Sequence, residues 1–514
     1  MGNENKLTEP ENSSPSRREF LKTGAQALGG LAVASALPHS AAATPDVPRP
    51  NFVFYLGEGV RADEFSSTGN KIISTPHLDR VVREGMNFPN AFVINALCLP
   101  SRATILTGLY SHTTGCIDNG DVYRHPPRGS LASNPNEYTG SHGRALPPGL
   151  PTFADTLRDA GYEIALIGKA HIMGAAKRDW DYYFGIEAAA ANYYDPVITE
   201  SAKGIVKSEK AYQGYVDDIF TDRALAWLNQ EHKKPFCLFL WFIAPHGPFY
   251  RPRRYLDLYD GVDIPKPPTF DDDLKGYPGK PFFFKYTTNK IGTTVFAGDA
   301  ARSLEELVKD HYVGVVTNDD CMGRIFDALE RTGKMDDTVI VVSADHGYFL
   351  GEWRFYDKRF MYEPSIRVPL AIRYPRLIRP GVRQEMALNL DIAPTILELA
   401  GLKVPEWMQG RSLVPFLKGS EPPQWRKDWL YEYYEYPAPD MVPKHRGVRT
   451  DRYKLIDYWE APEIFELYDL QEDPLERHNL YGFSGYAKLA EHLRDRIRQL
   501  RIETRDVFEQ EEYQ

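Results

Sequence analysis

The stretch "TVIVVSADHG", residues 338–347, contains the pattern that the rest of the chain repeats. Its first part is rich in β-branched residues, which is typical of a strand buried on both faces in a parallel sheet. Asp345 and His346 follow directly after this run. Open α/β sheets bind ligands outside the carboxyl ends of their strands. The stretch therefore predicts a fold class and the position of a site together.

Three further apolar runs end in the same way. With the polar residues that follow them, these runs are 51–56 with Glu58, 162–167 with Lys169 and His171, and 236–244 with His246. Each cluster alone is compatible with an ordinary loop. Because all four clusters follow strand-like runs, we expect them to converge on one pocket.

Helix-like segments, several of which end in glycine, alternate with the apolar runs. They cover residues 77–85, 152–161, 221–230 and 319–333. This alternation predicts an α/β fold with a large, mostly parallel sheet sandwiched by helices.

Beyond about residue 415 the pattern changes to alternating aromatic and charged residues, which indicates a short antiparallel sheet. A terminal amphipathic helix is expected over roughly residues 485–505. The predicted organisation is a catalytic domain over residues 44–415 and a smaller C-terminal α+β subdomain over residues 416–514.

Composition excludes several classes of protein. The chain has 514 residues, 42% of them hydrophobic, and a formal net charge of -10 without a basic block, which argues against a nucleic-acid binder. Its four cysteines are too scattered for a disulfide framework. No segment after the N-terminal region reaches the length of a transmembrane helix, so stable membrane insertion is not expected.

The N-terminal residues 1–43 resemble a twin-arginine export signal. Arg17 and Arg18 precede a weakly apolar, Ala/Gly-rich stretch and a region of small residues. The alternatives are a disordered tail or a short membrane anchor. The signal interpretation predicts the twin-arginine translocase as a partner, and a periplasmic or extracellular location in a bacterium.

The side chains expected in the pocket suit ester hydrolysis. Glu58, Asp345 and His346 are ligands for Ca²⁺, Mg²⁺ or Mn²⁺. A metal, several cations and two imidazoles together favour a hydrolase of sulfate or phosphate esters. Cys98 would hold the nucleophile position, since the following residues 102–108 are expected to begin a helix whose dipole favours an anion.

The segment "CLPSRA", residues 98–103, resembles the Cys-x-Pro-Ser-Arg signature of the type I sulfatases, in the alkaline phosphatase-like superfamily. The segments at 50–63, 168–171, 244–249 and 343–370 resemble other parts of that family. In the family, a maturation enzyme converts the cysteine to Cα-formylglycine. The resemblance therefore implies that Cys98 is the precursor of an aldehyde, with Ser101 and Arg102 in the recognition sequence.

The resemblance also implies a role for each site residue. The implied metal ligands are Glu58, Asp345, His346 and the group made from Cys98, with Ca²⁺ the expected ion and Mg²⁺ or Mn²⁺ the alternatives. In the implied reaction, the formylglycine hydrate at position 98 attacks sulfur, and Arg102 supports its diol. Lys169 and Lys358 bind sulfate oxygens, and His246 with Lys358 protonates the leaving alcohol. His171 then removes a proton from the second hydroxyl.

Two positions depart from the family pattern. The first strand of the family usually ends in Ala-Asp-Asp, whereas here Gly57, Glu58 and Gly59 stand in those places, so that one carboxylate is longer and another is missing. Either Glu58 or water fills the gap, or the site binds metal weakly. Trp353 stands where many relatives have histidine, and it is expected on the substrate side of the pocket.

The segment at residues 431–456 resembles bacterial sulfatases that act on N-acetylglucosamine-6-sulfate or N-sulfoglucosamine units. The resemblance implies a sulfated carbohydrate, possibly a glucosamine 6-O-sulfate, as substrate. The residues expected to project from a loop toward the sugar are Asp440, Lys444, His445 and Arg446. The alternative for this segment is a solvated polar loop.

Three functional hypotheses remain from the sequence. The first is a formylglycine sulfatase acting on a sulfated carbohydrate. The second is a phosphonate or phosphate ester hydrolase of the same superfamily. The third is a catalytically impaired protein that binds sulfated glycans, which the missing carboxylate at Gly59 would explain.

Overall fold

The computed structural model describes residues 49–119, 145–147, 149–272, 280–285, 291, 303–435, 442–459 and 464–506. The predicted export signal over residues 1–43 and the predicted substrate residue Asp440 lie outside the described residues.

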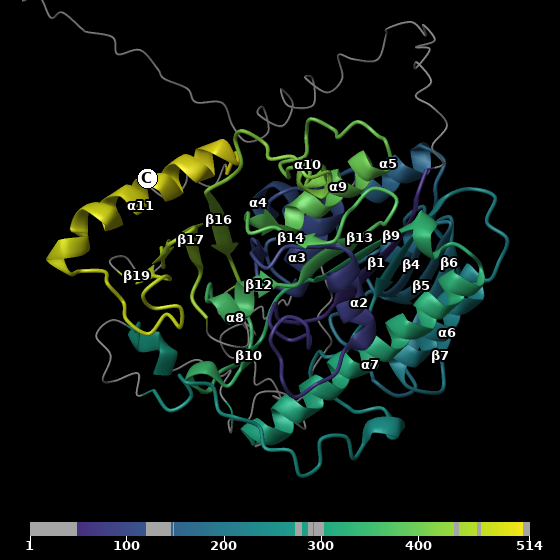
Figure 1. Ribbon diagram of the computed structural model, residues 1–514, viewed down its shortest axis with the longest axis horizontal. Coiled ribbons are helices and arrows are strands. Elements are labelled where there is room, and N and C mark those ends of the chain that lie inside the picture. Colours follow the sequence, from purple (N-terminus) through teal and green to yellow (C-terminus); the bar gives the residue numbers. More distant parts are fainter. Residues whose placement is uncertain are drawn as a thin grey trace, which may run out of the picture. The chain divides into compact units, whose positions relative to one another are not determined.

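A ten-stranded sheet forms the centre of the fold (Figure 1). Its strands, in spatial order, are β14 (Gly381–Val382), β2 (Met86–Asn87), β13 (Leu370–Arg373), β9 (Thr338–Ala344), β1 (Asn51–Gly57), β8 (Phe236–Trp241), β4 (Glu163–Lys169), β5 (Tyr182–Ile186), β6 (Val197–Ala202) and β7 (Ile205–Ala211). The neighbours from β9 to β5 are all parallel, as the buried apolar runs predict. Strands β13, β6 and β7 pair antiparallel to their neighbours, so the sheet as a whole is mixed.

The hairpin of β6 and β7 was not expected from the sequence. Its two-residue turn consists of Lys203 and Gly204, which both have positive φ angles of 50° and 70°. Such a turn makes β7 antiparallel to β6. The antiparallel edge itself begins one strand earlier, where β6 pairs antiparallel with β5.

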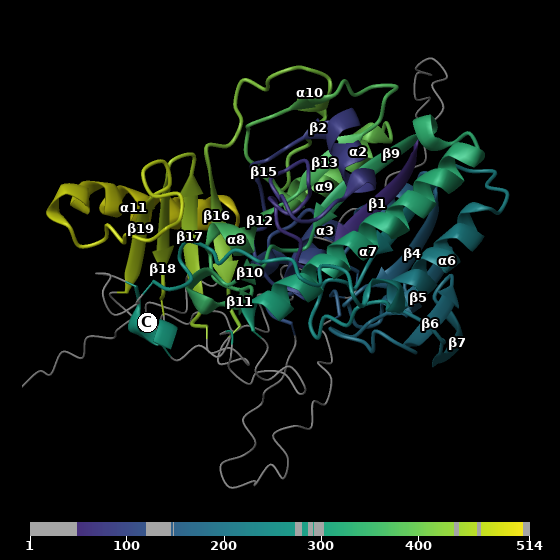
Figure 2. The same cartoon turned by 60° about the horizontal axis from the view of Figure 1, so that its bottom comes forward.

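Two groups of helices lie on the two sides of the strands (Figures 1 and 2). One group consists of α2 (Pro76–Glu84), α6 (Val216–Leu228) and α7 (Leu304–Arg331), and the other of α3 (Cys98–Thr107), α5 (Phe153–Asp159) and α9 (Ile392–Leu399). The α/β fold with a helix-sandwiched sheet is thereby confirmed. The smaller elements are β3 (Ala91–Phe92), α4 (Ser111–Thr114), β10 (Phe349–Leu350), β11 (Tyr356–Asp357), α8 (Glu363–Ile366), β12 (Arg367–Val368), β15 (Ala387–Leu388) and α10 (Val414–Leu417).

Side-chain caps begin the two best-defined helices. The Ser303 hydroxyl accepts a hydrogen bond from the Glu306 amide, and the Glu306 carboxylate accepts one from the Ser303 amide. This cap starts α7 at Leu304, fifteen residues before the start of the helix-like segment 319–333 that the sequence indicates. Thr152 and Asp155 form the same reciprocal cap on α5. These caps satisfy amide groups that would otherwise lack partners at the helix start.

The core is centred on aromatic side chains of the middle strands. Phe239 on β8 contacts the rings of Phe54, Phe153, Trp180 and Trp241, with centroid distances of 5.3 to 6.2 Å. All of these rings are buried. Each such side chain stabilises the fold by roughly 1.5–3 kcal/mol through its removal from water, so the strands that end at the site are anchored firmly.

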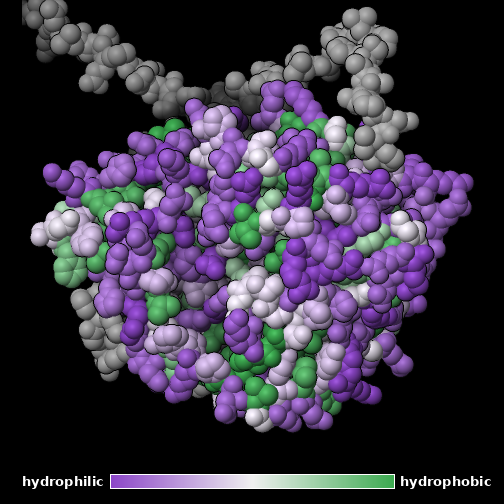
Figure 3. All heavy atoms as spheres, viewed as in Figure 1, coloured by the Kyte–Doolittle hydropathy of each residue, from purple (hydrophilic) through white to green (hydrophobic). Residues whose placement is uncertain are grey.

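A second, four-stranded antiparallel sheet follows. Its strands are β16 (Asp428–Tyr433), β17 (His445–Thr450), β18 (Tyr453–Asp457) and β19 (Phe465–Asp469), in sequential order, and α11 (Ala487–Glu503) packs on them. Both the short antiparallel sheet and the terminal helix are therefore confirmed. The face of the molecule in Figure 3 is largely hydrophilic, with small apolar groups scattered over it. Within the described residues, no helix is both long and apolar enough to cross a membrane.

A buried histidine connects this C-terminal sheet to the main body. His112 on α4 has its Nδ1 2.6 Å from the Glu432 carboxylate on β16, and its Nε2 donates to the carbonyl oxygen of Thr504 at 2.9 Å. Burial opposes the charged imidazolium, but the adjacent Glu432 carboxylate raises the pKa of His112 to about 9. The ion pair therefore contributes to stability only while His112 is protonated.

We predict that this contribution depends on pH. Because the pKa of His112 is higher in the folded than in the unfolded chain, the contribution is complete below pH 6.5 and is lost as the pH rises through about 9. Its full size is about 3 kcal/mol. Thermal unfolding of the wild type and of His112→Gln between pH 6 and pH 9.5 measures it, and the difference in Tm should shrink with rising pH. His478→Gln, at a histidine whose side chain is 63% exposed, is the control and should show little difference. A difference in Tm for His112→Gln that is constant with pH would contradict the ion pair.

Candidate active site

The carboxyl ends of four adjacent strands form the candidate site. In the spatial order β9, β1, β8 and β4, the strands lead to Asp345, Glu58, His246 and Lys169. Gly57 is paired with Ala344, and both Leu56 and Gly168 are paired with Trp241, so the strands end at one level. The structure thus brings together the four polar clusters that the sequence places after strands.

A glycine at the end of β4 makes this close approach possible. A Cβ atom added to Gly168 would lie 1.8 Å from the carbonyl oxygen of Trp241 on β8, and its φ angle is +127°. Only glycine tolerates both conditions. The glycine therefore allows β4 to lie against β8 and to place Lys169 at the site.

Cys98 is the first residue of α3 and lies at the centre of a buried group. Its Sγ donates to Glu58 Oε1 at 2.7 Å and lies 3.4 Å from His346 Nε2. One potential ligand atom from each of Glu58, Cys98, Asp345 and His346 lies within 4.8 Å of the others. Two carboxylates and an imidazole at this spacing fit a divalent cation.

Two cations neutralise the charge of this group. Lys169 Nζ lies 2.9 Å from Glu58 Oε1, and the Arg102 guanidinium bonds to Glu58 Oε2 and to Asp345 Oδ2, the latter at 2.9 Å. All four side chains are fully buried. Burial alone would raise the pKa of Glu58, but Lys169 and Arg102 hold it well below its ordinary value. Burial and the charge of Glu58 raise the pKa of Asp345.

Two histidines present the same ring nitrogen to the group. His246 Nδ1 donates to the carbonyl oxygen of Gly247 at 2.7 Å, and His346 Nδ1 donates to that of Gly347 at 2.8 Å. The Nε2 atom of each ring is thereby left for the site, and that of His246 lies 3.8 Å from Glu58 Oε1. Burial, Lys169 and Lys358 lower the pKa of His246 well below its usual value.

His171 follows β4 in a left-handed backbone conformation, with φ of 50°. Its side chain is fully buried, and neither ring nitrogen has a hydrogen-bond partner among the described residues. Burial and the Lys169 charge lower its pKa well below the usual value. His171 is therefore a neutral imidazole with an available nitrogen.

Lys358 lies in a strained segment between two charged residues that sequence reasoning missed. Its Nζ is 3.0 Å from Asp357 Oδ1, and the Arg359 guanidinium bonds to Asp357 Oδ2. Asp357 and Arg359 have φ angles of 80° and 95°, which are costly for residues with side chains. Despite burial, Asp357 raises the pKa of Lys358. The only available signal was the run Asp-Lys-Arg itself, since both neighbours of the lysine are charged.

Gly59 occupies a restricted position beside the group. Its amide donates to Asp345 Oδ1 at 3.1 Å, and its φ angle is +76°. An added Cβ would lie 3.0 Å from the Tyr348 ring and 3.3 Å from the His346 ring. The backbone amide of Gly59 and the ring of Tyr348 thus lie beside a position where the family pattern has a carboxylate.

The predicted substrate residues do not share one loop. His445 and Arg446 belong to β17 and, as neighbours in a strand, point to opposite faces of the C-terminal sheet. His445 is buried against the rings of Phe360, Tyr431, Tyr433 and Tyr458. The expectation of a loop is therefore wrong for these two residues, and Lys444 immediately precedes the strand.

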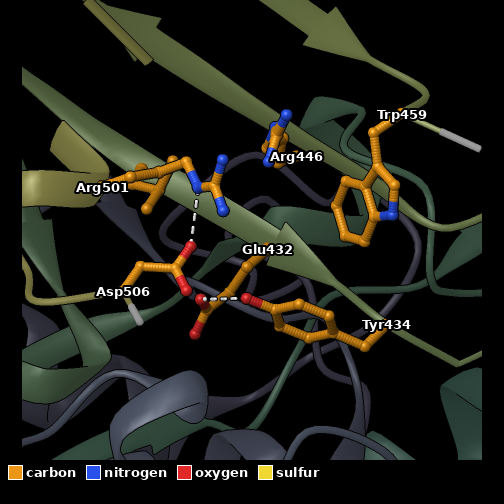
Figure 4. A pocket seen from close by; sticks show the side chains of 7 residues that line it. Glu432, Tyr434, Arg446, Trp459, Arg501 and Asp506 are labelled. Atoms are coloured by element: carbon orange, nitrogen blue, oxygen red, sulfur yellow. Dashed lines mark hydrogen bonds and ion pairs between the residues drawn. The ribbon is translucent and has the colours of Figure 1, made fainter. Parts of the chain in front are cut away.

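Arg446 instead lines a cavity between the sheet and α11 (Figure 4). The cavity is lined by Leu430, Glu432, Tyr434, Arg446, Trp459, Arg501 and Asp506. The Arg446 guanidinium lies 5.1 Å from the centre of the Trp459 ring and bonds to Asp457 at 3.2 Å. None of the residues around Cys98 lines this cavity.

Trp353 is buried in an aromatic cluster. Its ring lies 5.0 Å from that of Tyr362 and 6.4 Å from that of Phe349, and the Lys280 ammonium lies 4.5 Å from its centre. These contacts pack the segment that leads to Lys358. A role of Trp353 on the substrate stays a prediction.

Comparison with known proteins assigns the chain to a family. Residues 50–402 match the sulfatase family, and residues 351–503 match the family described as N-sulphoglucosamine sulphohydrolase, C-terminal. An N-acetylglucosamine-6-O-sulfatase of Bacteroides thetaiotaomicron is 32% identical over 519 residues, which span 90% of this chain and 88% of the relative.

Solved structures agree with this assignment. A protein in complex with its substrate D-glucosamine-2-N,6-O-disulfate matches with a TM-score of 0.79 and 30% identity, over 90% of this chain and 99% of that one. A phosphonate monoester hydrolase of Silicibacter pomeroyi, with a TM-score of 0.71 and 24% identity over 89% of this chain and 96% of its own, shares the fold. The chain belongs to the sulfatase family of sulfuric ester hydrolases.

Proposed function

We propose that this protein removes the 6-O-sulfate of a glucosamine unit in a sulfated carbohydrate, with a formylglycine made from Cys98. The observation that carries the proposal is the buried group in which Cys98 contacts Glu58 and His346, with Lys169 beside it. Relatives named for glucosamine 6-sulfate support the choice of sugar.

The residues present fit both groups that the reaction requires. A divalent cation held by Glu58, Asp345 and His346 would supply positive charge beside a sulfate oxygen, and the hydrated aldehyde at position 98 would supply the attacking hydroxyl. Ca²⁺ is the proposed ion, because most of the donors are carboxylate oxygens. Cys98 lies at the N-terminus of α3, whose dipole favours an anion there.

Charged side chains of the protein would hold the sulfate. Lys169 and Lys358 would contribute ammonium groups, and Arg102 holds the two carboxylates in place. The His246 side chain is 16% exposed and that of Lys358 is 5% exposed, whereas Glu58, Lys169 and Arg102 are fully buried. We infer that the ester enters beside His246 and Lys358.

Proton transfer is assigned to the two remaining histidines. His246 would donate a proton from Nε2 to the leaving oxygen, and the negative charge of a bound sulfate ester counteracts the effects that lower its pKa. His171, which is neutral, would accept a proton after the leaving group has departed.

The remaining parts of the proposal concern the cell. The twin-arginine signal would direct an exported protein to the periplasm or the exterior, with the translocase and a formylglycine-generating enzyme as partners.

The division into a catalytic domain over residues 44–415 and a C-terminal subdomain over residues 416–514 remains part of the proposal.

Two alternative functions can be distinguished from this proposal by experiment. A phosphonate ester hydrolase shares the fold with this chain at 24% identity, which shows the fold alone. A binding protein without turnover would follow if the site lacked metal because of Gly59. The complete set of cations and imidazoles around Cys98 favours a hydrolase over the binding protein. The higher identity to relatives that act on glucosamine sulfates supports the sulfatase over the phosphonate hydrolase.

We predict that the purified protein releases sulfate from N-acetylglucosamine 6-sulfate. Activity on this sugar and on 4-nitrophenyl sulfate should exceed activity on a phenylphosphonate ester, because this chain is more similar to relatives that act on glucosamine sulfates than to the phosphonate hydrolase. Cys98→Ala should lower the rate at least about 10³-fold, since it removes the nucleophile. Cys237→Ala, at a buried cysteine of β8, is the matched control and should retain activity. Preference for the phosphonate ester would favour the first alternative, and binding of the sugar without turnover would favour the second.

We predict that protein from its native host carries an aldehyde at position 98. Mass spectrometry of the tryptic peptide that spans residues 84–102 should show the aldehyde mass in place of the thiol mass. Cys116, Cys237 and Cys321 should retain thiol masses in the same digest. An unmodified thiol at Cys98 in active protein would exclude the formylglycine mechanism.

We predict that an added carboxylate at position 59 does not strengthen metal binding. Gly59→Asp places a side chain against the Tyr348 ring in a left-handed backbone, so calcium titration should give equal or weaker affinity and Tm should fall. Gly115→Asp is the matched control, because Gly115 has φ of +73° and open space around its Cβ. It should carry only the backbone cost of about 1 kcal/mol. Tighter calcium binding by Gly59→Asp would show that the missing carboxylate weakens the site.

A further inference from the structure

The segment that carries His246 is held by hydrogen bonds from buried side chains of other elements. Asp217 on α6 accepts from the amides of Ile243 and Ala244, at 3.0 and 2.9 Å. Asn318 on α7 donates from Nδ2 to the carbonyl oxygen of Ala244 at 2.6 Å. Backbone groups just before His246 are therefore bonded to side chains rather than to a neighbouring strand.

A third side chain bonds to the carbonyl group of the histidine itself. The hydroxyl of Tyr193 donates to the carbonyl oxygen of His246. Asp217, Asn318 and Tyr193 are at most 1% exposed. Breaking these bonds would leave buried polar groups without partners, which is costly, so the three side chains hold the segment in position.

Fixing this backbone fixes the direction of the imidazole. The Nδ1 atom of His246 bonds to the carbonyl oxygen of Gly247, within the same segment, and its Nε2 lies 3.8 Å from Glu58 Oε1. A shift of the segment would therefore carry Nε2 away from the Cys98 group. Misplacement by about 1 Å is enough to cost about 100-fold in rate for a reacting group.

We propose that Asp217 and Asn318 are positioning residues for His246, and that they set the distance from its Nε2 to the leaving oxygen. This inference rests on the proposed function, in which His246 protonates that oxygen. Neither side chain contacts Glu58, Cys98, Asp345 or His346 in the hydrogen bonds and ion pairs of the described residues. Both act through the backbone of residues 243–246.

Two substrates with different leaving groups distinguish a misplaced His246 from a general loss of structure in the site. The alcohol of N-acetylglucosamine 6-sulfate needs a proton as it departs, whereas 4-nitrophenolate leaves without one. Asp217→Asn and Asn318→Ala should therefore lower kcat on the sugar sulfate about 30- to 100-fold and on the aryl sulfate less than about threefold, with KM nearly unchanged.

Asp319→Asn is the matched control. Asp319 is the neighbour of Asn318 on α7 and accepts two backbone hydrogen bonds from the start of α2, at the amides of His77 and Leu78. It is likewise buried. Its loss should cost comparable stability without any selectivity between the two substrates. Equal losses on both substrates for Asp217→Asn and Asn318→Ala, or the same selectivity in Asp319→Asn, would overturn the proposal.

Chemical modification of His246 tests its positioning without any measurement of enzyme activity. Diethyl pyrocarbonate modifies free imidazole nitrogens, and the extent at His246 can be read by peptide mass spectrometry against the exposed His478. Asp217→Asn and Asn318→Ala should raise the rate at His246 at least threefold, and Asp319→Asn should leave it unchanged. An unchanged rate in both variants would overturn the positioning role. Wild-type protein that cleaves neither sulfate would refute the proposed function, and the labelling would then decide the positioning role alone.

Discussion

The buried ion network between Glu58, Asp345, Arg102 and Lys169 is the constraint on which the structure depends. Removing such charges from water costs several kcal/mol for each ion unless they are paired closely. Here each carboxylate has a cation within hydrogen-bond distance, and no member of the network is exposed. The four side chains come from four regions of the sequence, so the network can form only after the strands and α3 are in place. The parallel centre of the sheet is what brings them together, because it places several strand ends side by side.

The same constraint accounts for backbone strain at three residues of the candidate site. Positive φ angles occur at His171, Asp357 and Arg359, and all three residues are buried. His171 follows Lys169 in the chain by two residues, and the other two residues flank Lys358. Residues in such conformations persist only where the surrounding structure determines them strongly. The aromatic core below the strand ends and the packing around Trp353 provide that support. Rigid surroundings also keep solvent away, which strengthens every electrostatic contact inside the site.

The convergence of the four polar clusters could be predicted from the sequence because the signal for each cluster is local. An apolar run followed at once by Asp345 or Glu58 defines both a strand and its polar end, and the parallel order then follows from the helices between the runs. The hairpin at Lys203 and Gly204 was missed because β7 is largely exposed and β6 buries only Ile198 and Ser201, so neither strand is an apolar run. The partner of Lys358, Asp357, was missed because an acidic neighbour in sequence looks like an ordinary surface residue.

Contacts between residues far apart in the chain could not be predicted from the sequence. Nothing in the local sequence shows that Asp217 on α6 bonds to the backbone before His246, since the two are joined only through the packing of α6 beside the sheet. The opposite directions of His445 and Arg446 follow from strand geometry, but only once the segment is known to be a strand rather than a loop.

The arrangement of the imidazoles bears on whether the site evolved for turnover or for binding. A site that only binds sulfate needs cations and amide donors, and Lys169, Lys358 and the start of α3 would suffice for it. Neutral imidazoles add little to the binding of an anion. His171, buried without a hydrogen-bond partner among the described residues, is a cost to stability that binding alone does not explain. In the proposed function, a proton acceptor such as His171 and a proton donor such as His246 are what the two-step transfer requires. The histidines therefore argue for catalysis more strongly than the cations do, and they do so independently of the missing carboxylate at Gly59.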